Sequence, residues 1–257
     1  MAKLLRNLMP LPSRLRFVLW RILPAMECVT VRLYTGETLT IRRPPNLDLE
    51  VAFEVYASRI YLSPRPLAGD SIRCVVDVGA NVGYALVFLA RSFPKANIVA
   101  FEPHPGNAQQ AMANIGANHL EDRTTLHVAA AGVRPGTAYI TDRSAGSRVT
   151  LQDDRTGLLP IEVLDFFDTV GSREIDFLKI DCEGGEYDLL MDPRFETLRA
   201  QVLVMEWHLT AQHPSADAEL MRRLHNCGWD LVPTGEYRKY MPENGFFGTG
   251  IVWGFRR

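Results

Sequence analysis

Residues Val75–Gly83 read VVDVGANVG, and residues Ile98–Pro103 read IVAFEP. The first stretch is an apolar run typical of a buried strand, which breaks at glycines and leads into a helical pattern over 84–92. The second stretch is another apolar run that ends on a carboxylate, Glu102. A strand, a glycine-containing turn, a helix and a second strand make a βαβ unit of the nucleotide-binding type.

The glycines and the acid have separate physical roles in such a unit. Gly79 and Gly83 lack the Cβ atom that would keep the backbone away from a ligand, and they open a helix whose free N–H groups face that ligand. The Glu102 carboxylate can accept hydrogen bonds from both hydroxyls of a ribose. We therefore expect an adenosine cofactor at this turn.

The turn itself reads D-x-G-A-N-x-G, whereas dinucleotide sites prefer G-x-G-x-x-G. Asp77 would repel a pyrophosphate but could hold a cationic group such as the amino end of a methionine moiety. This difference favours S-adenosylmethionine over NAD. The residues expected to bind the cofactor are Asp77, Gly79, Ala80, Asn81, Gly83, Tyr84, Glu102, Pro103 and Asp181.

Strand-like and helical patterns alternate along most of the chain, which predicts an α/β fold with a doubly wound parallel sheet. The expected parallel strands are 74–78, 98–101, 125–129, 177–180 and 202–205, and the expected helices are 84–92, 105–118, 185–198 and 215–227. The tail adds two strands, 229–232 and 250–255. We expect residues 132–164 to form an irregular insertion with short strand-like pieces that overhangs the carboxyl edge of the sheet.

The first part of the chain, residues 1–70, is expected to form a helical and hairpin appendage to a cofactor-binding domain over 71–257. Residues 28–43 alternate apolar and polar side chains around a Thr-Gly-Glu turn and predict a hairpin. Helical spacing follows over 48–61. Residues 1–26 hold five Lys and Arg residues and no acid, so this segment carries +5 and the remainder −7, given the net charge of −2.

The basic segment 1–26 is too interrupted by charges to span a bilayer or to serve as a secretory signal. Leu15, Val18, Leu19 and Ile22 share one helical face. We expect this helix to pack on the domain or on a partner subunit, which leaves a homodimer possible. Peripheral contact with an anionic membrane is the alternative.

The amino-acid composition limits the size of the core, the expected partners and the cellular compartment. At 257 residues and 47% hydrophobic, the chain can bury one full core with an appendage. A pI near 6.3 gives no overall field that would favour nucleic acid, so no nucleic-acid partner is expected. The four cysteines lack C-x-x-C spacing, which indicates reduced thiols in a cytoplasmic protein.

The second half carries a further motif, FLKIDCEGGE over Phe177–Glu186, followed by MEWH over Met205–His208. With the two earlier stretches, these motifs make the chain resemble the FkbM family of class I S-adenosylmethionine-dependent methyltransferases over roughly residues 45–255. Gly185 departs from the alanine common in that family. The resemblance implies a Rossmann-like sheet of seven strands, the last antiparallel, and methylation of a hydroxyl oxygen on a sugar or secondary metabolite.

The expected catalytic residues follow the ends of neighbouring strands. Asp181 ends the fourth parallel strand, while Glu206 and His208 lie at the end of the fifth, where period-two alternation puts them on one side. An alcohol must lose its proton, which requires a general base tuned near neutrality. His208 with an unperturbed imidazole is the first choice and Glu206 the second, with Asp181 orienting the hydroxyl or the cofactor.

Several alternatives stay open at this point. A Mg²⁺ or Mn²⁺ ion held by Asp181, Glu206 and His208 is possible but not favoured. Lys179 could form an ion pair, and Glu183 and Glu186 could be helix-capping acids. A nicotinamide-dependent oxidoreductase or a non-catalytic binding module could share the fold.

The acceptor, a small molecule or a glycan, cannot be identified from the sequence. Five aromatic residues could line its site or fill the core: Trp207, Tyr237, Tyr240, Phe246 and Phe247.

Overall fold

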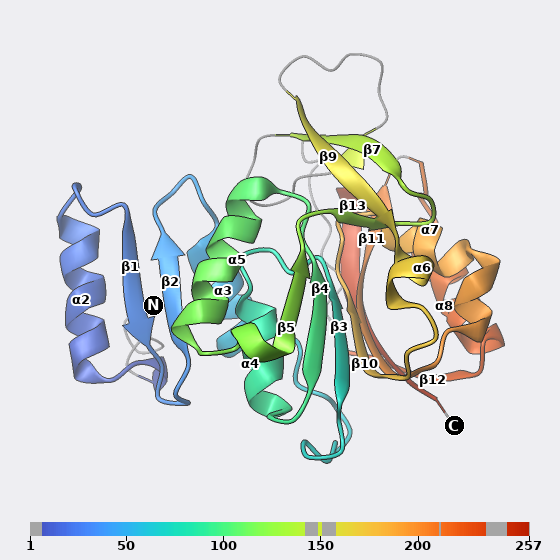
Figure 1. Cartoon of the computed structure of the whole chain (residues 1–257), viewed down its shortest axis with the longest axis horizontal. Helices are drawn as coiled ribbons and strands as arrows, with labels where there is room; N and C mark the ends of the chain where they lie inside the picture. Colours follow the sequence, from blue (N-terminus) through green and yellow to red (C-terminus); the bar gives the residue numbers. More distant parts are fainter. Residues whose placement is uncertain (1–6, 142–148, 151–157, 211, 235–245, 257) are drawn as a thin grey trace.

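A computed structural model of the chain describes every residue except 1–6, 142–148, 151–157, 211, 235–245 and 257. The main sheet lies between two groups of helices (Figure 1). A further helix and a hairpin lie at one end of the molecule, and a smaller sheet lies above the main sheet in this view. Tyr237 and Tyr240 of the candidate aromatic residues fall outside the described residues.

The main sheet has seven strands in the order β12-β13-β11-β10-β3-β4-β5. Their bounds are β3 (Cys74–Val78), β4 (Asn97–Phe101), β5 (Thr124–His127), β10 (Ile175–Ile180), β11 (Ala200–Thr210), β12 (Trp229–Pro233) and β13 (Phe246–Arg256). Among these described strands, β13 runs in the opposite direction to the other six, and it pairs antiparallel with both β11 and β12. The expected doubly wound sheet with an antiparallel last strand is confirmed.

The strand order reverses between β3 and β10, because successive strands run outward from this pair in both directions. In open α/β sheets, ligands bind at such a switch point, beyond the carboxyl ends of the strands. Lys179 pairs with Asp77 across this boundary, and Ile180 with Val78. A ligand site is therefore expected at the residues that follow β3 and β10.

Alternating residues of the central strands enter two separate apolar clusters on opposite faces of the sheet. Val75 and Phe177 belong to one cluster, and Val76 and Leu178 to the other. The first face is covered by α3 (Asp48–Tyr56), α4 (Tyr84–Ser92) and α5 (Pro105–Ala117), and the second by α6 (Phe166–Val170), α7 (Glu186–Met191) and α8 (Ala216–Asn226). Period-two alternation in the sequence thus produces both faces of the core.

Two helices end earlier than the sequence predicts. The helix expected over 185–198 is divided into α7 and a 3-10 turn, η2 (Pro193–Thr197). Asp192 is extended with ψ of 133°, as the residue before a proline prefers. The helix expected to reach residue 61 ends at Tyr56, and Arg59 takes a left-handed conformation that a helix does not accommodate.

The short strand-like pieces expected in the insertion are confirmed, but its described residues form a sheet instead of the expected irregular segment. It forms a four-stranded sheet in the order β6-β9-β7-β8, with bounds β6 (Ala130–Gly132), β7 (Gly136–Thr141), β8 (Val149–Thr150) and β9 (Leu158–Asp165). Pro160 obscures β9 in the sequence, because proline is unusual inside a strand. It fits here because β6 pairs only with residues 163–165, so that among the described strands Pro160 has a neighbour, β7, on one side alone.

The predicted hairpin is confirmed as β1 (Cys28–Arg32) and β2 (Thr38–Arg42), preceded by α2 (Leu11–Ile22). One face of the hairpin is buried in the same apolar cluster as Val75 of the main sheet. Helix α2 covers the hairpin with Phe17 and Trp20. Among the described residues, each helix is too short or too polar to traverse a bilayer.

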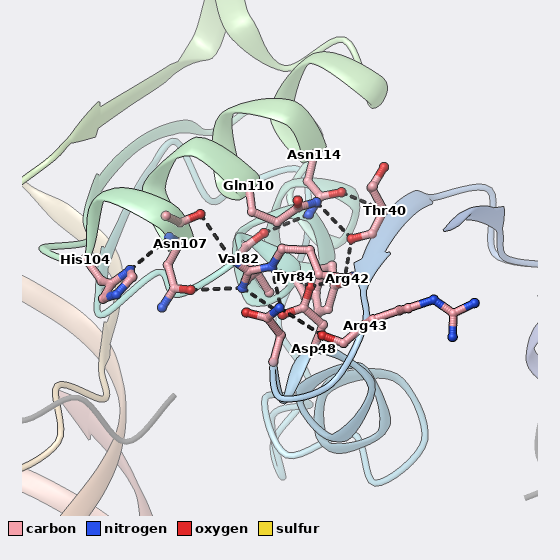
Figure 2. Close-up of polar contacts among 12 residues, drawn as sticks. Thr40, Arg42, Arg43, Asp48, Val82, Tyr84, His104, Asn107, Gln110 and Asn114 are labelled. Atoms are coloured by element: carbon pink, nitrogen blue, oxygen red, sulfur yellow. Dashed lines mark hydrogen bonds and ion pairs between the residues drawn. The ribbon is translucent and has the colours of Figure 1, made fainter. Parts of the chain in front are cut away.

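Polar contacts bind the hairpin to the helices beside the glycine turn (Figure 2). The Thr40 N–H donates to Asn114 Oδ1 at 2.8 Å. The Thr40 carbonyl accepts from Gln110 Nε2 at 2.9 Å and from the Tyr84 hydroxyl at 2.7 Å. The hairpin is thus held by α4 and α5, the two helices that flank the nucleotide-binding unit.

Arg42 makes the strongest of these connections (Figure 2). Its guanidinium donates to Asp48 from Nε at 2.9 Å and from Nη2 at 2.7 Å, and Nη2 also lies 2.9 Å from Asn107 Oδ1. The Asp48 side chain is only 2% exposed. This ion pair is therefore largely removed from water, and removal of one partner would leave the other charge uncompensated.

We expect Asp48→Ala to lower the free energy of unfolding by about 3 kcal/mol, because Arg42 would lose its buried partner. Urea denaturation at neutral pH measures the change. Asp70→Ala is the matched control, since Asp70 pairs with Lys95 at 3.3 Å while both side chains are at least half exposed. That variant should stay within about 0.5 kcal/mol of the wild type. Equal losses in the two variants would contradict a structural role of the Arg42–Asp48 pair.

Candidate active site

The glycine turn connects β3 to α4 at the switch point of the sheet. Gly79 and Gly83 have φ of +83° and +82°, a region that side chains rarely tolerate. A Cβ atom on Gly79 would lie 1.8 Å from the Asp181 carbonyl oxygen, and one on Gly83 would lie 3.1 Å from Ala111 Cα. Glycine is thus needed at 79 for contact with the neighbouring strand, a reason that the sequence did not indicate.

Glu102 lies where the sequence predicts a ribose-binding acid. It is buried directly after β4 and accepts hydrogen bonds from the N–H groups of Asn81 at 2.8 Å and His104 at 2.9 Å. Burial raises its pKa to about 7, although these N–H groups oppose the shift. Hydroxyl donors would favour the ionised form further. A buried carboxylate tied to the glycine turn therefore fits the diol of an adenosine.

A buried ion pair between Lys179 and Asp77 lies beside the glycine turn. Lys179 and Asp77 are both fully buried, with Nζ 2.9 Å from Asp77 Oδ1. Burial alone would lower the pKa of Lys179, but the charges of Asp77 and Asp181 raise it above its ordinary value. Lys179 also donates to the Gly79 carbonyl at 2.9 Å. Of the alternatives left open for Lys179, the structure thus shows the ion pair, while a contact of Asp77 with a cationic ligand stays a prediction.

Asp181 joins the two halves of the site. Its carboxylate accepts a hydrogen bond from the Tyr61 hydroxyl at 2.7 Å and lies 3.8 Å from Lys179 Nζ. Its carbonyl meets Gly79, and its charge acts on Glu206. Tyr61 was missed in the sequence because it follows α3, 120 positions before its partner, in a stretch without any motif.

Glu206 and His208 lie close together, as the alternation along β11 predicts. His208 Nε2 is 3.9 Å from Glu206 Oε1, and the Thr249 hydroxyl on β13 donates to the same oxygen at 2.8 Å. On its other side, His208 Nδ1 is 2.8 Å from Glu186 Oε1. Glu183 approaches Nε2 to 3.8 Å. The imidazole therefore has three carboxylates around it.

These carboxylates change the charge state expected for His208. Burial disfavours the imidazolium, but the charge and hydrogen bond of Glu186, together with the charges of Glu183 and Glu206, outweigh burial and raise the pKa of His208 to about 10. The prediction of an unperturbed imidazole is therefore wrong, because the sequence did not reveal Glu186 as its partner. Burial and the Asp181 charge raise the pKa of Glu206 to about 8, against the opposing effect of His208.

Glu186 is the second residue that sequence reasoning missed as part of the site. It is fully buried in the first turn of α7, where the helix dipole favours an acid, and it accepts from the Gly184 N–H at 2.8 Å before the helix, although, among the described residues, it makes no capping hydrogen bond to the helix itself. Its contact with His208 adds a second role. A histidine in a strand with many apolar residues was the available signal, since a buried imidazole needs a polar partner.

Other candidate residues contribute in different ways. The Tyr84 ring is fully buried, and its hydroxyl binds the hairpin rather than the turn. Ala80 is buried within the turn, while Asn81 and Pro103 are partly exposed beside Glu102. Trp207 is buried in the core against Gly250.

Phe246 and Phe247 lie in β13. Within the described part of the chain, no three acidic, histidine or cysteine side chains are arranged to hold a metal ion.

The strand order, the glycine turn and the acid after β4 define a Rossmann-like methyltransferase fold. Residues 77–246, more than half of the chain, match the family profile described as "Methyltransferase FkbM domain". The chain belongs to the FkbM methyltransferase family, and the resemblance seen in its sequence is confirmed.

Known relatives agree with this assignment. The chain is 25% identical over 187 residues to "Methyltransferase 1" of Beauveria bassiana and 26% identical over 196 residues to "Methyltransferase sdnD" of Sordaria araneosa. Each alignment covers 62% of this chain and 74% of the relative. The crystal structure of M. jannaschii TYW2 in complex with AdoMet superposes with a TM-score of 0.50 at 16% identity, covering 90% of this chain and 87% of that one. The last comparison concerns the fold alone.

The raised pKa of His208 predicts a pH-dependent stability. Its folded pKa of about 10 exceeds the usual unfolded value of about 6.5, so its contribution is complete below pH 6.5 and is lost as the pH rises through 10. Glu206, raised to about 8, acts in the same direction at lower pH. The free energy of unfolding should therefore fall between pH 6 and pH 10, as urea denaturation at several pH values would measure.

Glu186→Gln provides the comparison for this prediction, because it removes the main charge that raises the pKa of His208. The dependence above pH 7 should become shallower in this variant, and the imidazole resonances in an NMR titration should shift at lower pH. A wild-type His208 that titrates near its ordinary value would show that the Glu186 contact does not form in solution.

Proposed function

We propose that this protein is an S-adenosylmethionine-dependent O-methyltransferase acting on a hydroxyl group of a sugar or a secondary metabolite. The observation that carries the proposal is the set of contacts made by Asp181. Its carbonyl meets Gly79 of the turn that is tied to a buried ribose-type acid, Glu102, and its charge acts on a second acid, Glu206, whose pKa is raised toward the range of a general base. One half of the site thus suits a nucleoside, and the other suits removal of a proton.

The cofactor-binding half is proposed to use Glu102 for the ribose hydroxyls and the turn from Gly79 to Gly83 for close backbone approach. S-adenosylmethionine supplies an activated methyl group on a sulfonium. The family membership supports this choice, as does the AdoMet in the TYW2 structure that shares the fold. The D-x-G-A-N-x-G pattern speaks against the nicotinamide alternative, since it lacks the dinucleotide spacing.

The protein's own chemical task is to align the hydroxyl with the methyl carbon and to accept the hydroxyl proton. We assign the proton to Glu206 rather than to His208. With a pKa near 10, His208 carries its proton at neutral pH and cannot accept another, whereas Glu206 titrates near 8. The imidazolium lowers the pKa of Glu206 and so favours its ionised, proton-accepting form.

Calorimetry with S-adenosylhomocysteine on the purified protein tests the cofactor. Wild type should bind saturably, and Glu102→Ala should bind about 10²-fold more weakly, because two charged hydrogen bonds to the ribose would be lost. Glu174→Ala is the control, since Glu174 is exposed and pairs at 3.4 Å with Arg199 on the surface. Tight NAD binding without binding of the methionine-derived ligand would replace the proposal by an oxidoreductase.

The general base can be tested with a panel of sugar and hydroxylated aromatic acceptors, using mass spectrometry to detect a gain of one methyl group. Glu206→Gln should lower turnover by about 10²–10⁴-fold with nearly unchanged cofactor affinity. The wild-type rate should rise with pH through about 8, and His208→Gln should move this rise to higher pH because the cation is removed. A rise centred near 10 would instead assign the base to His208, and cofactor binding without any methylated product would favour a binding module.

A further inference from the structure

Helix α2 has one face on the protein and a second face in water. Ser13, Phe17 and Trp20 are buried against the hairpin. The opposite face is apolar as well, and its side chains are 48–66% exposed: Leu11, Leu15, Val18, Leu19 and Ile22. Leu23, the extended residue that follows the helix, is 46% exposed. Figure 1 shows α2 at one end of the molecule, with the hairpin between it and the other helices.

This concentration of exposed apolar side chains is unusual for the molecule. The described residues contain eleven exposed large apolar side chains, and six of them are on α2 or on Leu23, the residue that follows it. Scattered exposed leucines need no explanation, but a continuous apolar stripe marks a surface that binds something. We call the six side chains the α2 stripe.

Arginines flank the α2 stripe on both sides. At 3.6 residues per turn, Arg16 projects from one border between the stripe and the buried face, and Arg14 and Arg21 from the other. The sequence contains no acid before Glu27. An apolar stripe bordered by cations matches a helix that lies in the interface of an anionic bilayer, where arginines reach the lipid phosphates.

We propose that the protein docks on anionic membranes through the α2 stripe, with the helix axis parallel to the bilayer surface. The charge distribution supports a membrane over a second copy of the chain, because two stripes packed face to face would bring like-charged arginines together. The same charge distribution sets the orientation of the protein on the membrane. Residues 1–26 carry +5 and the rest of the chain −7, so an anionic surface attracts α2 and repels the remainder of the protein.

Vesicle co-sedimentation tests the proposal with full-length protein. Wild type should pellet with vesicles of phosphatidylcholine and phosphatidylglycerol, and much less with phosphatidylcholine alone. Binding should weaken as salt rises, because part of the attraction is electrostatic. A wild-type protein that stays in the supernatant with both kinds of vesicle, or that binds both equally, would overturn the proposal.

Leu15→Glu combined with Ile22→Glu places two carboxylates in the α2 stripe and should weaken vesicle binding by about 10²-fold. The control is Leu62→Glu, which changes an equally exposed leucine outside α2 and should bind as the wild type does. Thermal unfolding checks that each variant is folded. Arg16→Gln with Arg21→Gln is a second, milder variant that should lose only the preference for phosphatidylglycerol.

Light scattering distinguishes membrane docking from the alternative occupant of the α2 stripe, a second copy of the chain. The proposal expects the same mass in solution for wild type and for the Leu15→Glu, Ile22→Glu variant. A wild-type dimer that this variant converts to a monomer, without vesicle binding by either, would assign the α2 stripe to a second copy of the chain. Because the readout is sedimentation and mass rather than turnover, the result does not depend on the proposed methyl transfer.

Discussion

The arrangement of the site depends on one buried cation, the ammonium group of Lys179. It lies between two neighbouring central strands, where it meets the Asp77 carboxylate and the carbonyl of Gly79, with Asp181 close by. A charge in this position would be very unfavourable without partners, so the sheet must bring these groups together in order to fold. The glycine turn, the end of β10 and Tyr61 are consequently held in one network.

A second group of interacting charges adjoins the Lys179 network through Asp181. Asp181 faces the Lys179 network on one side and raises the pKa of Glu206 on the other, while His208 acts in the opposite sense. His208 in turn depends on Glu186 for its proton. The pKa values of Glu206 and His208 therefore depend on each other and on the carboxylates around them.

The sequence was informative where a local pattern determines structure, and uninformative where distant residues meet. The apolar runs of β3 and β4 and the alternation in the hairpin predicted their elements, because burial on one or both faces leaves a clear periodicity. Strand β9 was missed because Pro160 disguises it. The acids Glu102 and Asp181 could be placed from strand ends, but the partner of His208 could not, since Glu186 approaches it only after α7 packs on β11.

The support that Lys179 and Asp181 give to the glycine turn has a consequence for ligand recognition. The turn has its positive φ angles and its contacts with the neighbouring strand fixed within the folded chain. The conformational entropy of ordering it is lost during folding and not during association. A nucleoside entering such a rigid cradle should associate without a slow isomerisation step, so differences in affinity among related ligands should reside mainly in their dissociation rates.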